Sequence, residues 1–415
     1  MGMAVDDPQQ FARRLELERS KLAESANMHE ADREAADAWL KRKSGTVEIS
    51  SLETYLRRVR LASERADTPL VEMDADAFHS LVFSLRHDYD LSDATLRSYE
   101  NAALPFIEDM TGAEWPEDFE RTRVKSKVTD LDSVLTPADI QELVSTARHQ
   151  RDVAFIEFLA DTGSRLSLAL SLRVRDVDLS KPPTYTPNPN ATGLKGASIR
   201  EYPLIDSVAV LRSYLRTSHP RPDDPNVALF HKIKPHSRTA DERWSDDGSI
   251  RTNAIRQQLG RVAARAGVDK PVNPHAFRHA AISRMAREGY TRSQIEHRVH
   301  WTLDTDMWET YEHISSAEHN ADIFRSVGLV DAETGPDMVR KPCGNCREPL
   351  APRHEFCPNC GSPATAAASE QVTASKGTVL ERLVDEMNPT TRRELRELLE
   401  LIDEHPALAD HDDSS

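Results

Sequence analysis

The sequence predicts a mostly helical, multidomain α+β protein with one small antiparallel sheet. Amphipathic runs that begin at capping residues and end at glycines fill most of residues 46–330. A proline-rich stretch at 182–189 is followed by the alternating ASIREYPL at 197–204, which predicts a strand. Four cysteines fall within residues 343–360, which predicts a separate small unit. With 415 residues, the chain is long enough for several such domains.

The first 112 residues are predicted to be mostly helical. Residues 1–45 are an N-terminal extension whose polar, alanine-rich run at 8–43 predicts one or two exposed helices. Residues 46–112 form a small all-helical unit, and the polar run that follows at 113–134 predicts a linker. Within the helical unit, Ser92 is placed to cap the helix ATLRSYENAALPFIEDM, and Gly112 follows that helix as its stop.

Residues 130–330 form the longest predicted domain, and its first helix has a clear start signal. Thr136 is a good N-cap, and Pro137 suits the first turn of the helix that follows. A second helix, DVAFIEFLADTG, ends at Gly163. After the predicted strand, helical patterns return at 251–266, 274–288 and 292–300.

The charge of the chain is unevenly distributed. The formal net charge is −16, from 53 basic and 69 acidic side chains, which taken alone argues against a nucleic-acid partner. Residues 251–300, however, carry ten Lys or Arg against three Asp or Glu, a basic island that could meet a phosphate backbone. Arginine outnumbers lysine 41 to 12, and together with the acidic excess this composition predicts a halophilic, haloarchaeal source.

One helix start in the basic island is suited to an anion. Asn273 can cap the helix NPHAFRHAAISRMAREG, and Pro274 fits its first turn. His275 and Arg278 are three residues apart, so they lie on one face of the first turns. Free backbone N–H groups with an imidazole and a guanidinium beside them can bind a phosphate.

Four ordered motifs carry a resemblance to a known family. HAFRH followed by HWTLDTDMWETYEHIS, together with LADTGSRLSLAL and GLKGASIREYPL upstream, resembles the tyrosine recombinase (phage integrase) family. The resemblance implies that residues 130–330 are the catalytic domain of this family. It also implies that residues 46–125, with SDATLRSYENAALPFIEDM, are the SAM-like core-binding domain that precedes it.

The resemblance assigns roles that agree with the chemistry of each side chain. It implies cleavage of DNA by Tyr311 through a 3′-phosphotyrosyl intermediate, with no metal or nucleotide required. Arg165 and Arg278 would bind the phosphate oxygens, and Lys195 would protonate the leaving 5′-oxygen. His275 would shuttle the tyrosine proton or hold the phosphate. The sixth position of the family is a His or a Trp, for which we favour Trp301, because its indole N–H can donate to a phosphate; His300 is the alternative.

The same resemblance sets the expected partner and the rival functions. Double-stranded DNA is the expected partner, and family members act as tetramers on two duplexes. One alternative is a type IB-like topoisomerase, which uses similar chemistry but rejoins the same strand. The other is a catalytically vestigial DNA-binding regulator, against which the full set of candidate catalytic residues argues, because DNA binding alone requires no such set.

The cysteines predict a metal site. Cys343, Cys346, Cys357 and Cys360 form CxxC-x10-CxxC, which resembles a zinc ribbon at 340–363 and suits a closed, structural Zn²⁺ site. Residues 364–415 follow as an acidic linker and helical tail, which favours a protein partner for the ribbon and the tail. No apolar run approaches the ~20 residues of a membrane helix, and MGMAVDDPQQ lacks the pattern of a signal peptide. We therefore expect a cytoplasmic protein with no membrane partner.

Overall fold

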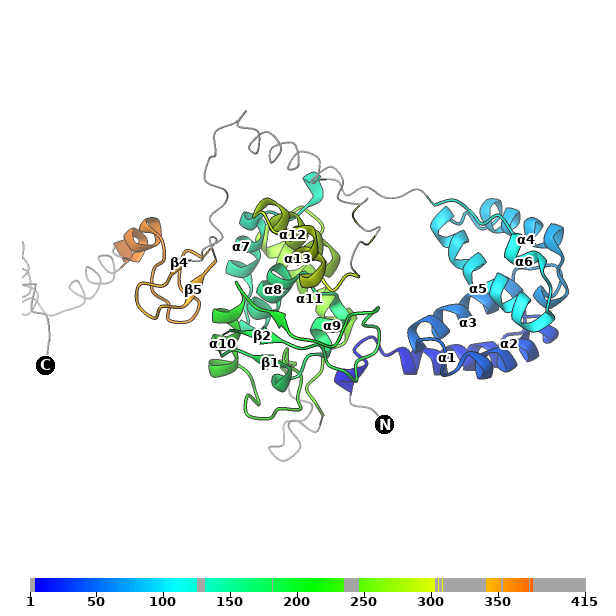
Figure 1. Cartoon of the computed structure of the whole chain (residues 1–415), viewed down its shortest axis with the longest axis horizontal. Coiled ribbons are helices and arrows are strands. Elements are labelled where there is room, and N and C mark those ends of the chain that lie inside the picture. The colour runs from blue at the N-terminus through cyan, green and yellow to red at the C-terminus, as the bar shows by residue number, and fades with distance from the viewer. Residues whose placement is uncertain are drawn as a thin grey trace, which may run out of the picture. The chain divides into compact units, whose positions relative to one another are not determined.

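The structure is a computed structural model (Figure 1). It divides into two units, residues 1–339 and residues 340–415, each of which is described by itself. The residues that the structure describes are 4–124, 131–180, 182–234, 246–302, 305, 308, 341–351, 354–372 and 374–375.

The N-terminal part of the first unit is a group of helices around one hydrophobic cluster. Trp39, Leu56, Phe78 and Phe106 are buried at its centre. The sequence predicted exposed helices over 8–43; two helices form there, but each turns an apolar face into this cluster. The helices are α1 (Phe11–Glu24), α2 (Glu30–Lys43), α3 (Ile49–Ser63), α4 (Ala75–His87), α5 (Asp93–Thr111) and α6 (Trp115–Asp118).

Helix α5 begins and ends where the sequence predicts. The Thr95 N–H donates to the Ser92 side chain at its start. At its end Gly112 has a φ of 72°, a left-handed conformation that glycine adopts without strain. Because α1 and α2 share the hydrophobic cluster with α3 and α5, the predicted boundary at residue 45 lies within a set of helices that share one core.

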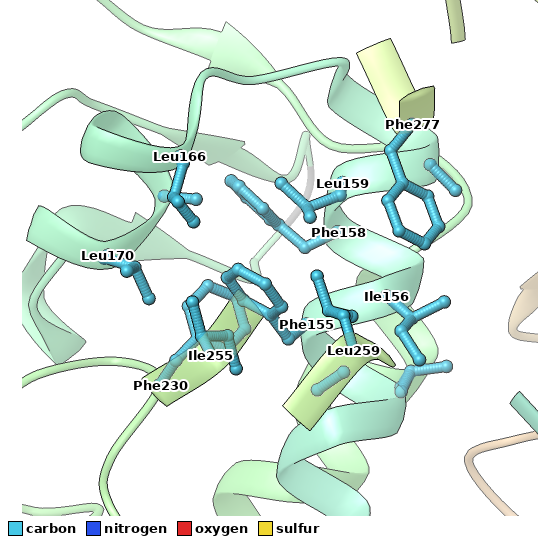
Figure 2. Close-up of a cluster of buried hydrophobic side chains, with 14 of the residues drawn as sticks. Phe155, Ile156, Phe158, Leu159, Leu166, Leu170, Phe230, Ile255, Leu259 and Phe277 are labelled. Carbon is cyan, nitrogen blue, oxygen red and sulfur yellow. The ribbon is translucent and has the colours of Figure 1, made fainter. Parts of the chain in front are cut away.

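The second part of the first unit is built around α8 (Gln150–Thr162). Helix α8 is almost entirely buried, and α7, α10 and α12 pack against it. Phe155, Phe158 and Leu159 of α8 lie in a cluster with Phe230 and Phe277 (Figure 2). The other helices are α7 (Pro137–Thr146), α9 (Leu166–Ser171), α10 (Val208–Thr217), α11 (Thr252–Ala266), α12 (Pro274–Arg287) and α13 (Arg292–Arg298).

The predicted small antiparallel sheet is present in this second part of the first unit. Its order is β1 (Val177–Asp178), β2 (Thr184–Tyr185) and β3 (Tyr202–Pro203), and Tyr185 pairs with Tyr202. The strand predicted over 197–204 is limited to its last part, because residues 194–197 form a turn and 198–200 are exposed. Pro203 lies in an edge strand, where its missing N–H costs no ladder bond.

The second unit contains a two-stranded antiparallel sheet, β4 (Lys341–Pro342) and β5 (Pro349–Leu350), next to the cysteines. Its hydrophobic cluster among the described residues is very small and consists of Cys343, Leu350 and Cys357, with Cys346 packed against it. In the part of the chain that the structure describes, every helix is too short or too polar to cross a membrane.

Candidate active site and cysteine site

The turn between α8 and α9 positions Arg165. Helix α8 ends at Gly163, which has a φ of 62°. A Cβ at Gly163 would lie 3.1 Å from both Ala281 and Val299, so the glycine also permits the close approach of α12 and of the end of α13. Arg165 follows as the N-cap residue of α9. The turn therefore places this arginine beside the start of α12.

Helix α12 supplies His275 and Arg278. The predicted cap is confirmed: the Asn273 side chain accepts the N–H groups of His275 (3.0 Å) and Ala276 (3.1 Å). Arg278 is 4 % exposed, and its Nη1 donates to the Gly163 carbonyl at 2.7 Å. A buried guanidinium with a fixed bond to the turn beside Arg165 has a defined orientation.

The two arginines make the surroundings of His275 positive. Partial desolvation, followed by the charges of Arg278 and Arg165, holds the pKa of His275 below its usual value. The ring of His279 lies 4.3 Å from the ring of His275, and burial, followed by the electrostatic effects of His275 and Arg278, lowers the pKa of His279 to about 4. Both imidazoles are therefore neutral at pH 7, and His275 is able to accept a proton.

His300 and Trp301 both reach this group after the end of α13. Burial, followed by the charges of Arg278 and Arg165, lowers the pKa of His300 to about 3, so its imidazole is neutral. The guanidinium of Arg278 lies over the ring of Trp301, 5.2 Å from its centre. His300 and Trp301 are 4 % and 7 % exposed, so both can contribute to the site from fixed positions.

Sequence reasoning missed the hydroxyl groups behind His300. The Tyr185 Oη lies 3.0 Å from His300 Nε2 and 3.1 Å from Ser164 Oγ. The ring of Tyr202 lies 4.1 Å from the ring of His300. His300 Nδ1 is buried and has no hydrogen-bond partner among the described residues. The position of Ser164 directly before Arg165 was the one signal in the sequence; nothing there indicated Tyr185.

Lys195 and Tyr311 are not among the residues that these contacts bring together. Lys195 is exposed and lies on the connection between β2 and β3. Tyr311 lies outside the described residues. The described residue that precedes it most closely is Trp308, whose Nε1 donates to Glu296 at 2.8 Å and whose ring packs on Trp301 at 5.5 Å.

The four cysteines converge. Their sulfur atoms all lie within 4.8 Å of one another. The Cys343–Cys360 and Cys346–Cys357 sulfur pairs are each separated by 3.6 Å. Four sulfurs bound tetrahedrally at the usual zinc–sulfur distance of ~2.3 Å would be about 3.8 Å apart. The arrangement is therefore of the size that a metal ion needs.

The chain is similar to known recombinases. The phage integrase family matches residues 133–318. An integrase/recombinase of Escherichia coli is 24% identical over 293 residues, which cover 61% of this chain and 80% of that protein. A tyrosine recombinase of Pseudothermotoga lettingae is 25% identical over 303 residues, which cover 65% of this chain and 94% of that protein.

Among solved structures, the Tn1549 transposon integrase in complex with circular intermediate DNA has the same fold. The TM-score is 0.52 at 16% sequence identity, and the match covers 70% of this chain and 99% of that one. The family match spans the turn at Gly163, the β2–β3 connection and α12, the elements that carry the predicted site. Residues 133–318, called the catalytic domain below, are therefore similar to the phage integrase family, and together with the recombinase relatives this match supports a site-specific recombinase.

Proposed function

We propose that this site-specific recombinase cleaves and rejoins DNA with Tyr311 as its nucleophile. The observation that carries the proposal is the convergence of Arg165, His275 and Arg278 around the turn at Gly163. Two guanidiniums and a neutral imidazole fit the needs of a phosphodiester in a displacement reaction, namely charge neutralisation and a proton acceptor.

In the proposed cleavage step, the Tyr311 oxygen forms a bond to phosphorus while the bond between phosphorus and the 5′-oxygen breaks. His275 accepts the tyrosine proton, for which its neutral imidazole is suited. Lys195 gives a proton to the departing 5′-oxygen, so a 5′-hydroxyl is released. In rejoining, a 5′-hydroxyl attacks the phosphotyrosine, and both proton transfers reverse.

For the sixth position we propose a division of labour. Trp301 holds the guanidinium of Arg278 through its ring face. His300 offers its buried Nδ1 to a phosphate oxygen when Tyr185 donates to Nε2, because the neutral imidazole then carries its proton on Nδ1. Replacement of His300 should therefore slow cleavage even where Trp301 is retained.

A covalent-capture experiment tests the nucleophile. A duplex sequence selected from a randomised library with the full chain is converted to a nicked suicide substrate, and covalent protein–DNA adducts are counted on a denaturing gel. Tyr311→Phe removes only a hydroxyl, so DNA affinity should persist while the adduct disappears. An adduct that the Phe variant still forms would identify another nucleophile, and a wild-type chain that binds but never reacts would indicate a DNA-binding regulator.

We also propose that the four cysteines hold a structural Zn²⁺. Thiolate ligands favour zinc, and four of them leave no open position for chemistry. A metal ion with four protein ligands would have a structural role and take no part in DNA cleavage. Metal analysis of the full chain should find one zinc per chain, and substitution of any two cysteines should abolish it.

The remaining proposals concern the setting of the reaction. The acidic excess and the preference for arginine support a haloarchaeal source and a cytoplasmic location. The rate of DNA cleavage should then rise with the concentration of potassium chloride. The resemblance supports a tetramer on two duplexes, which sedimentation of the DNA complex tests. Residues 361–415 carry twelve acidic and five basic side chains, which supports a protein partner for the ribbon and the tail.

A further inference from the structure

The exposed turn that carries Lys195 receives little support from its own sheet. Strands β2 and β3 pair through two residues each, yet they are joined by the long connection 186–201. Lys195 and Gly196 both have positive φ values, 51° and 76°, and the Ala197 N–H donates to the Leu194 carbonyl at 3.2 Å. These features define a tight turn with Lys195 at its tip. The position of that turn must be fixed by something outside the strands.

Residues 4–11, called the N-terminal strap below, contact the chain just before this turn. The Thr192 N–H donates to the Asp6 carbonyl at 2.8 Å, and the Thr192 hydroxyl donates to an oxygen of Asp7 at 3.0 Å. The Asn188 amide donates to the Asp6 carboxylate at 2.8 Å. Residues 188 and 192 are thus both bonded to the strap, and Lys195 lies three residues further on.

The ring of Phe11 closes the same contact. A Cβ at Gly193 would lie 2.8 Å from Phe11 Cε2, so the backbone of the connection and this ring are in direct contact. Gly193 has a φ of 74°, a conformation that favours glycine. Any larger residue here would push the strap away from the connection.

The strap is itself anchored in the catalytic domain. Asp6 forms an ion pair with Arg173, which is only 4 % exposed. The Val5 N–H donates to Asp247 at 2.7 Å, and Gln9 bonds to Ser167 in α9, two residues after Arg165. A strap tied at several points can therefore hold the connection in one place.

We propose that the N-terminal strap is a positioning element that holds the turn bearing Lys195 for protonation of the 5′-oxygen. The proposal rests on the role of Lys195 given under the proposed function. The strap would contact neither the DNA phosphate nor the reacting atoms. It would act by holding the connection between β2 and β3 in place. Asp6 in the strap and Thr192 in the connection are the two principal positioning residues.

Two variants and one control test the strap. Asp6→Asn weakens the ion pair with Arg173, and Thr192→Val removes a hydroxyl from the connection without changing its volume. The control is Asp37→Asn, which removes a carboxylate from an exposed ion pair with Lys41 on α2. Thermal melting confirms that each full chain is folded; Thr192→Val keeps the test valid if Asp6→Asn does not fold.

The first readout is independent of activity. Brief treatment with trypsin, followed by mass spectrometry of the fragments, gives the rate of cleavage after Lys195. Because a released connection is a better protease substrate, both strap variants should be cut there faster than the wild type and the control. Unchanged rates in both variants would overturn the proposal.

The second readout isolates proton transfer. The duplex selected with the full chain is prepared with its ordinary 5′-oxygen or with sulfur in that bridging position. A thiolate leaves without protonation, since thiols ionise near pH ~8.5 and water near ~15.7. We expect the strap variants to cleave the ordinary duplex about ten- to a hundredfold more slowly, part of the ~10²–10⁴ that an acid contributes. They should cleave the sulfur duplex at nearly the wild-type rate.

The outcomes distinguish the proposed positioning role of the strap from the proposed general-acid role of Lys195. Equal losses on both duplexes would overturn the proposal, because the strap would then act on the fold or on the arginines. Lys195→Ala is measured in parallel, and failure of sulfur to rescue it would overturn its role as the acid. Faster trypsin cleavage in the strap variants would, in that case, still support the strap's hold on the connection.

Discussion

The catalytic domain and the second unit, residues 340–415, called the cysteine unit below, are ordered by different means. Helix α8 of the catalytic domain is almost entirely buried, and its aromatic rings pack against Phe230 and Phe277 within a large apolar cluster (Figure 2). In the cysteine unit, the buried apolar side chains among the described residues amount to Leu350, Ala351 and Ala368 besides the cysteines. Apolar contacts can sustain the first region, whereas the second would be stabilised by the proposed metal ion bound to its four sulfurs.

This difference sets how each region responds to damage. Many apolar contacts together supply the folding free energy of the catalytic domain. Its free energy of unfolding should therefore fall gradually as single side chains are removed. Free energy that comes from one ion is lost at once when the ion leaves. Each region should therefore unfold without the other. Stability should fall gradually with single substitutions in the catalytic domain and abruptly on metal loss in the cysteine unit.

Removal of the metal should have the largest effect. Structural zinc contributes about 10–16 kcal/mol of apparent binding energy in small metal domains, so chelation or Cys357→Ser should unfold residues 343–360. Hydrogen exchange measured region by region should show this loss while the melting of the catalytic domain is unchanged. Because no candidate catalytic residue lies among the cysteines, cleavage of a short suicide substrate should persist. Loss of that cleavage in a chain with a folded catalytic domain would show that the cysteine unit holds DNA or positions Tyr311.

A core truncation should damage the opposite region. Phe158 is fully buried, with ring contacts to Tyr185 at 5.3 Å and to Phe230 at 5.4 Å. Phe158→Ala should reduce the free energy of unfolding of the catalytic domain by about 3–5 kcal/mol, measured by urea denaturation, with zinc content unchanged. The control is Phe83→Ala on α4, where the ring is 64% exposed and the change should be within ~0.5 kcal/mol. Similar losses in the two variants would contradict the assignment of this core.

Arg278→Ala separates chemistry from stability within the catalytic domain. We expect duplex binding to persist, because many basic residues share it, while single-turnover cleavage falls by about 10²–10³. Substitution also removes the bond to Gly163, so the melting temperature must be measured alongside the rate. Near-normal cleavage in a folded variant would show that Arg278 does not touch the scissile phosphate.

Local sequence signals predicted the parts of the site that are fixed by local structure. The cap at Asn273 and the stop at Gly163 are short-range features, and they place His275, Arg278 and Arg165. The CxxC pairs similarly bring each pair of sulfurs together within a few residues. In both cases the residues that set the geometry are neighbours in sequence.

Long-range contacts account for what was missed. The bond between Asp6 and Asn188 joins residues far apart in the chain, and no periodicity or spacing marks it. Tyr185 on β2 likewise lies in hydrogen-bond contact with His300, which is 115 residues later in the chain. The apolar faces of α1 and α2 were missed because alanine and polar residues dominate them, so only the tertiary structure shows that Leu22 and Trp39 are buried.

The smallest predicted effect is a dependence of the catalytic domain on pH. Burial, followed by the charges of Arg278 and Arg165, lowers the pKa of His300 to about 3. Burial also lowers the pKa of His231 to about 4, and a backbone hydrogen bond with Lys232 opposes part of that shift. An unfolded histidine titrates near pH ~6.5. Between these values the unfolded chain binds more protons than the folded one, so the free energy of unfolding falls as the pH falls.

The urea midpoint of the catalytic domain should therefore decrease from pH ~6.5 towards pH ~4, and His231→Gln should make that decrease shallower. Zinc release is followed separately by metal analysis, because acid also protonates thiolates. A midpoint that stays constant or rises over this range would show that these buried imidazoles are not held neutral.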